Sequence, residues 1–177
     1  MNFPKITNSI IKEIKSSLNQ VSEDRCIDLV KSITSSERVY LTGMGRSGLV
    51  ARAFAMRLTH VGLTVHVVGD VTTPAIDEND LLVVISGSGR TDVSRHIAYK
   101  AKSAGAEVFL ITSQNDSEIG NLADSVLVIP VIIESVQPLG SPFEDAAYIF
   151  LETLVIMIMK TLDVTQNDMM LRHSNLE

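Results

Sequence analysis

The chain has 177 residues, a single cysteine and a formal net charge of −6. This length suits one domain, which we expect to span residues 1–177. The negative balance argues against nucleic-acid binding by bulk electrostatics, so an anionic ligand has to be held by local donors. A lone cysteine excludes an intramolecular disulfide and offers no metal cluster, and we expect no metal site.

No targeting or membrane segment is visible in the sequence. The first fifteen residues lack the apolar core of a signal peptide. The longest apolar stretch, 146–159, is interrupted by Glu152 and falls short of the ~20 residues that cross a bilayer. We therefore expect a cytoplasmic protein that has no membrane partner.

The first part of the chain has helical spacing. Apolar residues recur there mostly at steps of three and four positions, with a polar break in the middle. This pattern predicts N-terminal helices over 5–35, and Ser22 is placed to cap the second of them.

From residue 39 onward, short apolar runs alternate with helical stretches. The predicted strands are 39–41, 65–68, 81–85, 108–111 and 126–129. The helices predicted between them are 49–60, 90–104 and a short one near 118–122. Strands that are apolar on both faces and alternate with helices indicate a parallel sheet covered on both sides. We therefore predict an α/β fold, a three-layer α/β/α sandwich around a five-stranded parallel sheet.

The last predicted helix, about 142–162, carries apolar residues on more than one face. A helix of this kind is buried on all sides. Because one sheet cannot cover every face, we expect a subunit partner to cover the rest. A polar C-terminal tail, 164–177, follows this helix.

Two predicted strands end in glycine-rich loops that lead into helices, a place where backbone N–H groups favour an anion. The first loop, Gly43–Gly48, fits the Gly-x-Gly-x-x-Gly pattern. With Asp70 after the next strand, it is compatible with dinucleotide binding, but a single match of this kind is weak. A tight turn between strand and helix explains the glycines equally well.

The second loop is more specific. It reads Ser86-Gly87-Ser88-Gly89-Arg90-Thr91 and places three hydroxyl groups within six residues. Gly87 and Gly89 let the backbone curl around a small group. Hydroxyl and N–H donors that converge on a helix start suit a phosphate monoester, so this loop predicts phosphate binding.

The paired loops resemble those of the sugar isomerase (SIS) domain family. More narrowly, the chain is similar to the 6-phospho-3-hexuloisomerases, in stretches 54–60, 69–74, 139–144 and 172–177. The resemblance implies a single flavodoxin-like SIS domain that works as a homotetramer without metal or cofactor. It also implies the interconversion of D-arabino-3-hexulose 6-phosphate and fructose 6-phosphate through a cis-enediol, in the ribulose monophosphate pathway of formaldehyde assimilation.

The resemblance also implies roles for individual residues. Ser47, Ser86, Ser88 and Thr91, together with Gly87 and Gly89, match the phosphate-binding positions, and Glu144 matches the proposed general base. Gly45 and Arg46 of the first loop are assigned to the substrate. An acid or a cation must also steady the enediolate, and the candidates are Arg46, His60 and His173. The polar tail could carry His173 into a neighbouring subunit's site.

Three other functions stay open on the sequence. A non-catalytic SIS domain could bind the same sugar phosphate to control a partner. Another phosphosugar isomerase, acting on arabinose 5-phosphate or sedoheptulose 7-phosphate, would use the same loops. A nucleotide-dependent oxidoreductase is the most distant of the three, because it has no use for the second hydroxyl-rich loop.

Overall fold

A computed structural model of the chain describes residues 2–131 and 134–176. Its centre is a parallel five-stranded sheet of order β2-β1-β3-β4-β5. The strands are β1 (Val39–Thr42), β2 (Val65–Val67), β3 (Leu81–Ile85), β4 (Glu107–Thr112) and β5 (Ser125–Val128). This is the strand order of flavodoxin-like folds, and it confirms the predicted fold class.

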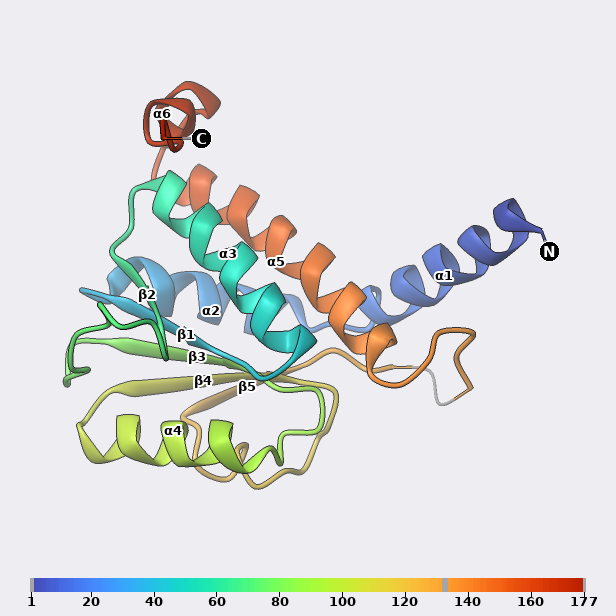
Figure 1. The fold of residues 1–177 in the computed structure, drawn as a ribbon, viewed down its shortest axis with the longest axis horizontal. Coiled ribbons are helices and arrows are strands. Elements are labelled where there is room, and N and C mark those ends of the chain that lie inside the picture. Colours follow the sequence, from blue (N-terminus) through green and yellow to red (C-terminus); the bar gives the residue numbers. More distant parts are fainter. Residues whose placement is uncertain (1, 132–133, 177) are drawn as a thin grey trace.

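Helices cover both faces of the sheet (Figure 1). They are α1 (Phe3–Leu18), α2 (Glu23–Ser35), α3 (Arg46–Val61), α4 (Asp92–Ser103), α5 (Ser141–Thr161) and α6 (Gln166–Leu171). Helices α2, α3 and α5 lie on one face, and α4 lies on the other.

Strand β3 shows how the sequence builds both layers. All five of its residues are buried. Leu81, Val83 and Ile85 join the core cluster beneath α3 and α5, whereas Leu82 and Val84 join the cluster beneath α4. Side chains alternate between the faces of a strand, so an unbroken apolar run serves two cores. This is why the continuous run predicted a sheet covered on both sides.

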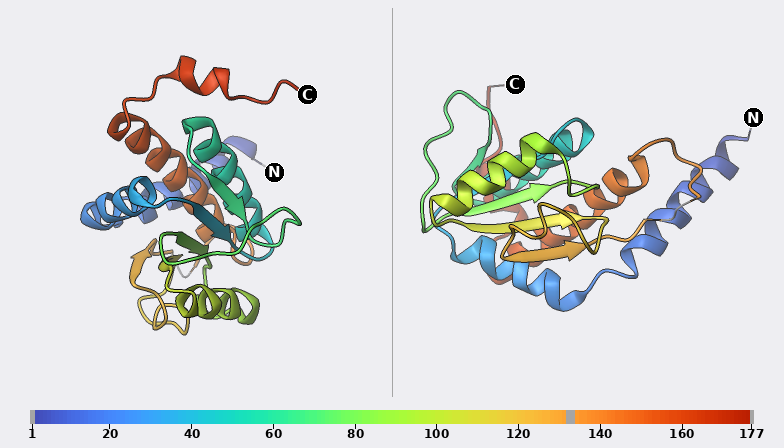
Figure 2. Two further views of the ribbon diagram at one scale, coloured as in Figure 1. Left: turned by 90° about the vertical axis from the view of Figure 1, so that its left-hand side faces the viewer. Right: turned by 90° about the horizontal axis from the view of Figure 1, so that it is seen from below.

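Helix α1 projects from the body of the molecule, and α5 runs through its centre (Figures 1 and 2). Within one chain α5 is packed against the sheet and its neighbouring helices, but it still exposes Tyr148, Ile149 and Ile156. Phe3, Ile6 and Ile11 of α1 are exposed as well. The covering of these apolar side chains by a subunit partner stays a prediction.

One local prediction was wrong. Residues 118–122 form a turn, not a short helix, because Ser117 Oγ accepts a hydrogen bond from Gly120 N and Ile119 N bonds to the carbonyl of Gly89. The predicted C-terminal tail, 164–177, contains a further helix, α6, which a capping box of Thr165 and Asp168 initiates.

Among the described residues, no helix is both long and apolar enough to cross a bilayer.

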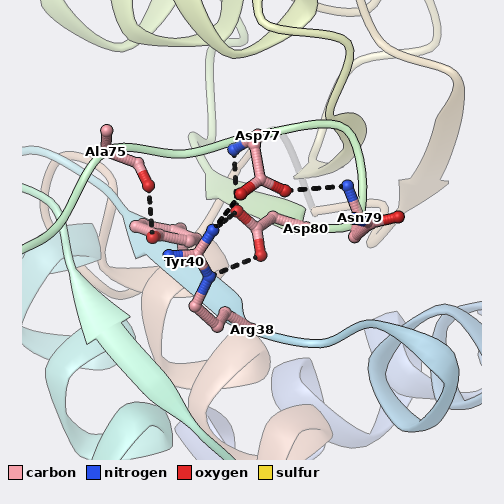
Figure 3. A network of polar contacts seen from close by, with 6 residues as sticks. All are labelled: Arg38, Tyr40, Ala75, Asp77, Asn79 and Asp80. Carbon is pink, nitrogen blue, oxygen red and sulfur yellow. Dashed lines mark hydrogen bonds and ion pairs between the residues drawn. The ribbon is translucent and has the colours of Figure 1, made fainter.

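An arginine joins the amino ends of β1 and β3 (Figure 3). Arg38 Nε and Nη2 donate to the two carboxylate oxygens of Asp80, at 2.8 and 2.7 Å, and Arg38 also pairs with Asp77. Asp80 is fully buried and accepts a further hydrogen bond from Asp77 N at 2.8 Å. The Tyr40 hydroxyl donates to the Ala75 carbonyl nearby. These bonds fix the loop before β3 to the start of β1.

Replacing Asp80 with alanine is expected to destabilise the fold and spare catalysis. The change leaves Arg38 without its buried partner, so we expect the Tm to fall by about 4–8 °C. The matched control is Asp77→Ala, because the Asp77 side chain is 53% exposed and should cost about 1–2 °C. Thermal unfolding followed by circular dichroism measures both changes. Equal shifts for the two variants would contradict a structural role centred on Asp80.

Candidate active site

The switch point of the sheet lies between β1 and β3, because the chain leaves these adjacent strands toward opposite edges. Ligands of open α/β sheets bind at the carboxyl ends of the strands at such a point. A cavity of about 620 Å³ is found there. Both glycine-rich loops and the start of α5 line it, and the contributing residues include Ser47, Ser86, Ser88, Thr91 and Glu144.

Three helices begin at this cavity, and none of the three has a side-chain cap. The N-cap residues of α3, α4 and α5 are Gly45, Thr91 and Gly140. The helices that begin elsewhere are capped by the side chains of Asn2, Ser22 and Thr165. Uncapped first turns present free backbone N–H groups and the positive end of the helix dipole. The cavity therefore offers hydrogen-bond donors and a positive potential to an anion.

Neighbouring groups pack closely against the glycines of the second loop and leave no room for a side chain. A Cβ on Gly87 would lie 2.9 Å from the Phe143 ring, and one on Gly89 would lie 2.3 Å from Ser117 Oγ. Gly89 also has a φ of 61°, which favours glycine. The Gly87 carbonyl accepts bonds from Ser113 N and Oγ and from Thr112 Oγ1. The glycines shape the loop, while Ser86, Ser88 and Thr91 line the cavity.

The first loop is also held tight by its glycines. A Cβ on Gly43 would lie 2.8 Å from the backbone of Ser47, and one on Gly48 would lie 2.6 Å from the Gly43 carbonyl oxygen. Gly45 has a φ of 58°. Close packing at Gly43 and Gly48, and the positive φ of Gly45, account for the Gly-x-Gly-x-x-Gly pattern without a dinucleotide. Asp70, the candidate ribose ligand, pairs with Arg52 at 2.8 Å, and both side chains are about half exposed.

Glu144 lies in the first turn of α5 and reaches the first loop. Its side chain is 14% exposed. Arg46 Nε donates to Glu144 Oε2 at 2.8 Å, and Ser47 Oγ lies 3.5 Å from Oε1. Arg46 Nη2 donates to Asp145 Oδ1 at 2.7 Å. The sequence assigned Arg46 to the substrate, whereas the structure places two of its donors on carboxylates of α5.

His60 and His173 lie together, but not at this cavity. Their ring centroids are 5.0 Å apart, at the far end of α3, where α6 folds back (Figure 2). His60 lies thirteen positions after Ser47 in α3, which corresponds to about 20 Å. Arg172 Nη1 donates to the carbonyls of His60 and Val61 there, a favourable place for a cation at a helix C-terminus.

Several polar residues of the cavity were missed from the sequence. They are Ser113, Gln114, Ser135 and Gln137. Ser113 and Gln114 directly follow β4, so the rule that ligands bind at strand carboxyl ends could have found them. Ser135 and Gln137 belong to an irregular segment before α5 and carry no periodic signal. In the part of the chain that the structure describes, no group of three or more His, Cys, Asp or Glu side chains is arranged to hold a metal ion.

Comparison with known proteins agrees with this geometry. The SIS domain matches residues 32–160. The 3-hexulose-6-phosphate isomerase of Bacillus subtilis (strain 168) is 35% identical over 185 residues, which cover 100% of each chain. That of Mycobacterium gastri is 40% identical over 182 residues, covering 97% of this chain and 92% of the relative.

A solved structure supports the same relationship. The crystal structure of a hypothetical protein from Methanococcus jannaschii, which infers a molecular function of 3-hexulose-6-phosphate isomerase, superposes with a TM-score of 0.86. It is 33% identical in sequence, and the match covers 97% of both chains. The chain belongs to the SIS domain family.

Proposed function

We propose that the chain interconverts 3-hexulose 6-phosphate and fructose 6-phosphate, with Glu144 moving the proton between carbons 2 and 3. The observation that carries this proposal is that Glu144 and the hydroxyl-rich loop line one cavity. The isomerase activity also agrees with the names of the relatives described above. The non-catalytic sensor requires the same phosphate loop but gives Glu144 no role.

The phosphate of the substrate binds the loop Ser86–Thr91. The hydroxyl groups of Ser86, Ser88 and Thr91, with Ser47 from the first loop, line the cavity and can donate to phosphate oxygens. Uncapped N–H groups at the starts of α3 and α4 supply further donors. These contacts hold the end of the sugar that does not react and present its other end to Glu144.

Glu144 acts as the base. In the forward direction its carboxylate removes the proton from carbon 2 of the 3-hexulose, and the electrons form a cis-enediolate. A proton then passes from the oxygen on carbon 2 to the oxygen on carbon 3, and the proton held by Glu144 returns to carbon 3. The carbonyl moves from carbon 3 to carbon 2. Arg46 donates to Glu144 Oε2 and to Asp145, so we assign it to orienting the base. A base held in one rotamer is in place before the substrate arrives.

The two histidines act, in this proposal, in the site of a neighbouring subunit. His60 lies about 20 Å along α3 from Ser47, which is beside Glu144. His173 lies next to His60, so both histidines are too far from Glu144 to touch the same sugar within one chain. In a neighbouring subunit's cavity, one of them would serve as the acid that protonates the enediolate oxygen. This role requires an oligomer. The homotetramer, the cytoplasmic location and the single domain expected from the sequence stay predictions.

A substrate panel tests the reaction. The chain is incubated in turn with fructose 6-phosphate, arabinose 5-phosphate and sedoheptulose 7-phosphate, and the products are identified by ¹³C NMR. We expect fructose 6-phosphate alone to give a new phosphorylated ketose with its carbonyl at carbon 3. Conversion of arabinose 5-phosphate instead would favour the other isomerase. Binding of fructose 6-phosphate without any conversion would favour the sensor.

A further inference from the structure

One wall of the active-site cavity is built by the irregular segment 134–140, which precedes α5. Ser135, Gln137, Leu139 and Gly140 of this segment all line the cavity. The segment has little regular structure of its own, and Leu139 is fully exposed and has a φ of 56°. The wall that faces the phosphate loop therefore depends on contacts from elsewhere for its position.

Those contacts come from α1, the helix that projects from the body of the molecule. Segment 134–140 passes beside α1 in Figure 1 and in the right-hand view of Figure 2. Glu13 of α1 accepts a hydrogen bond from Ser135 Oγ at 2.6 Å and another from Val136 N at 2.9 Å. Ser135 Oγ in turn accepts one from Gln137 N at 2.9 Å. A single carboxylate thus orders three consecutive residues.

The two hydrogen bonds to Glu13 differ from the other hydrogen bonds of segment 134–140 in the distance that they span along the chain. Among the described residues, they are the hydrogen bonds that connect segment 134–140 to an element distant in sequence. The other hydrogen bonds of the segment are local, such as the bond from Ser141 N to the Pro138 carbonyl. The hydrogen bond from Ser135, followed by that from Val136, holds the pKa of Glu13 below its ordinary value. Glu13 is therefore ionised, and a carboxylate is the strong acceptor that both donors need.

We infer that Glu13 is a positioning residue for substrate binding, which ties the cavity wall 134–140 to helix α1. It touches no substrate itself and acts through Ser135, Val136 and Gln137. The base, Glu144, and the phosphate loop are held by other contacts, so the reacting groups keep their places without it. This inference rests on the proposed function, because the wall matters for a sugar bound in that cavity.

The test measures KM, kcat and the Kd for fructose 6-phosphate in Glu13→Ala. We expect KM and Kd to rise about tenfold, with kcat within about threefold of the original chain, because a displaced wall weakens ground-state and transition-state binding alike. Glu13→Gln keeps a carbonyl oxygen for one of the two donors, so it should restore part of the loss. Partial unfolding would give the opposite pattern, a lower apparent kcat with an unchanged KM.

Two further variants serve as controls for Glu13→Ala. Lys12→Ala changes a neighbouring exposed side chain of the same helix and should leave KM unchanged. Adding Ser135→Ala to Glu13→Ala should raise KM by less than the product of the two single effects, because coupled residues are not additive. An unchanged KM and Kd in Glu13→Ala would overturn the inference. If the original chain binds fructose 6-phosphate without converting it, only the proposed function is overturned, because the Kd still tests the role of Glu13.

Discussion

Glu144→Gln is expected to lower kcat by about three orders of magnitude, within the range of a general base. Glutamine has nearly the same shape, and its carbonyl oxygen can still accept from Arg46 Nε, which lies 2.8 Å from Glu144 Oε2. The variant loses the basic carboxylate but keeps the cavity and the phosphate loop. The KM and the Kd for fructose 6-phosphate should therefore stay within a few-fold of the original values.

Asp145→Asn is the matched control for this variant. Asp145 follows Glu144 in α5 and also accepts from Arg46, but its side chain is 36% exposed and lies outside the lining of the cavity. We expect it to lower kcat less than about fivefold. If Glu144→Gln retained a tenth of the activity, or if Asp145→Asn lost as much as Glu144→Gln, Glu144 would not be the base.

Mixed oligomers of two inactive variants are expected to regain activity. Glu144→Gln lacks the base, and His173→Ala lacks a histidine that, in our proposal, serves a neighbouring subunit. When differently tagged copies are co-expressed and purified through both tags, some sites pair an intact Glu144 with an intact His173. Random pairing across a heterologous interface restores about a quarter of the sites. Steady-state rates of the doubly purified protein measure this recovery.

The control pair changes both histidines. Since His60 and His173 lie side by side in the same chain, mixing His60→Gln with His173→Ala leaves every histidine pair defective. No recovery is expected from this mixture. Equal recovery in the two mixtures would contradict the shared site, and so would a His173→Ala variant of unchanged activity.

The sheet could be predicted from the sequence because its strands are buried on both faces. β3 is apolar at each of its five positions, so it carries an unambiguous pattern. Helix α6 could not be found in this way, since its start depends on the Thr165 and Asp168 capping box, and it buries only Met169. Periodicity predicts a helix at the turn 118–122, because the bond of this turn to the Gly89 carbonyl links segments about thirty residues apart and leaves no periodic signal.

Part of the candidate site could likewise be predicted from the sequence, and part could not. The hydroxyl-rich loop follows a recognisable strand and faces the cavity, so its place was predictable. The orientation of Arg46 toward Glu144 was not, since the two are 98 positions apart. Glu13 and Ser135 are separated by 122 positions, and neither belongs to a motif. Long-range pairs of this kind become visible only in the folded chain.

Hydrogen exchange at carbon 3 of fructose 6-phosphate tests the role of Glu144 most directly. The sugar phosphate is incubated with the chain in deuterated water, and deuterium at carbon 3 is followed by NMR. We expect the original chain to exchange this hydrogen through the enediolate and Glu144→Gln to exchange it about a thousandfold more slowly. Rapid exchange by Glu144→Gln, or no exchange by the original chain despite binding, would contradict proton transfer by this carboxylate.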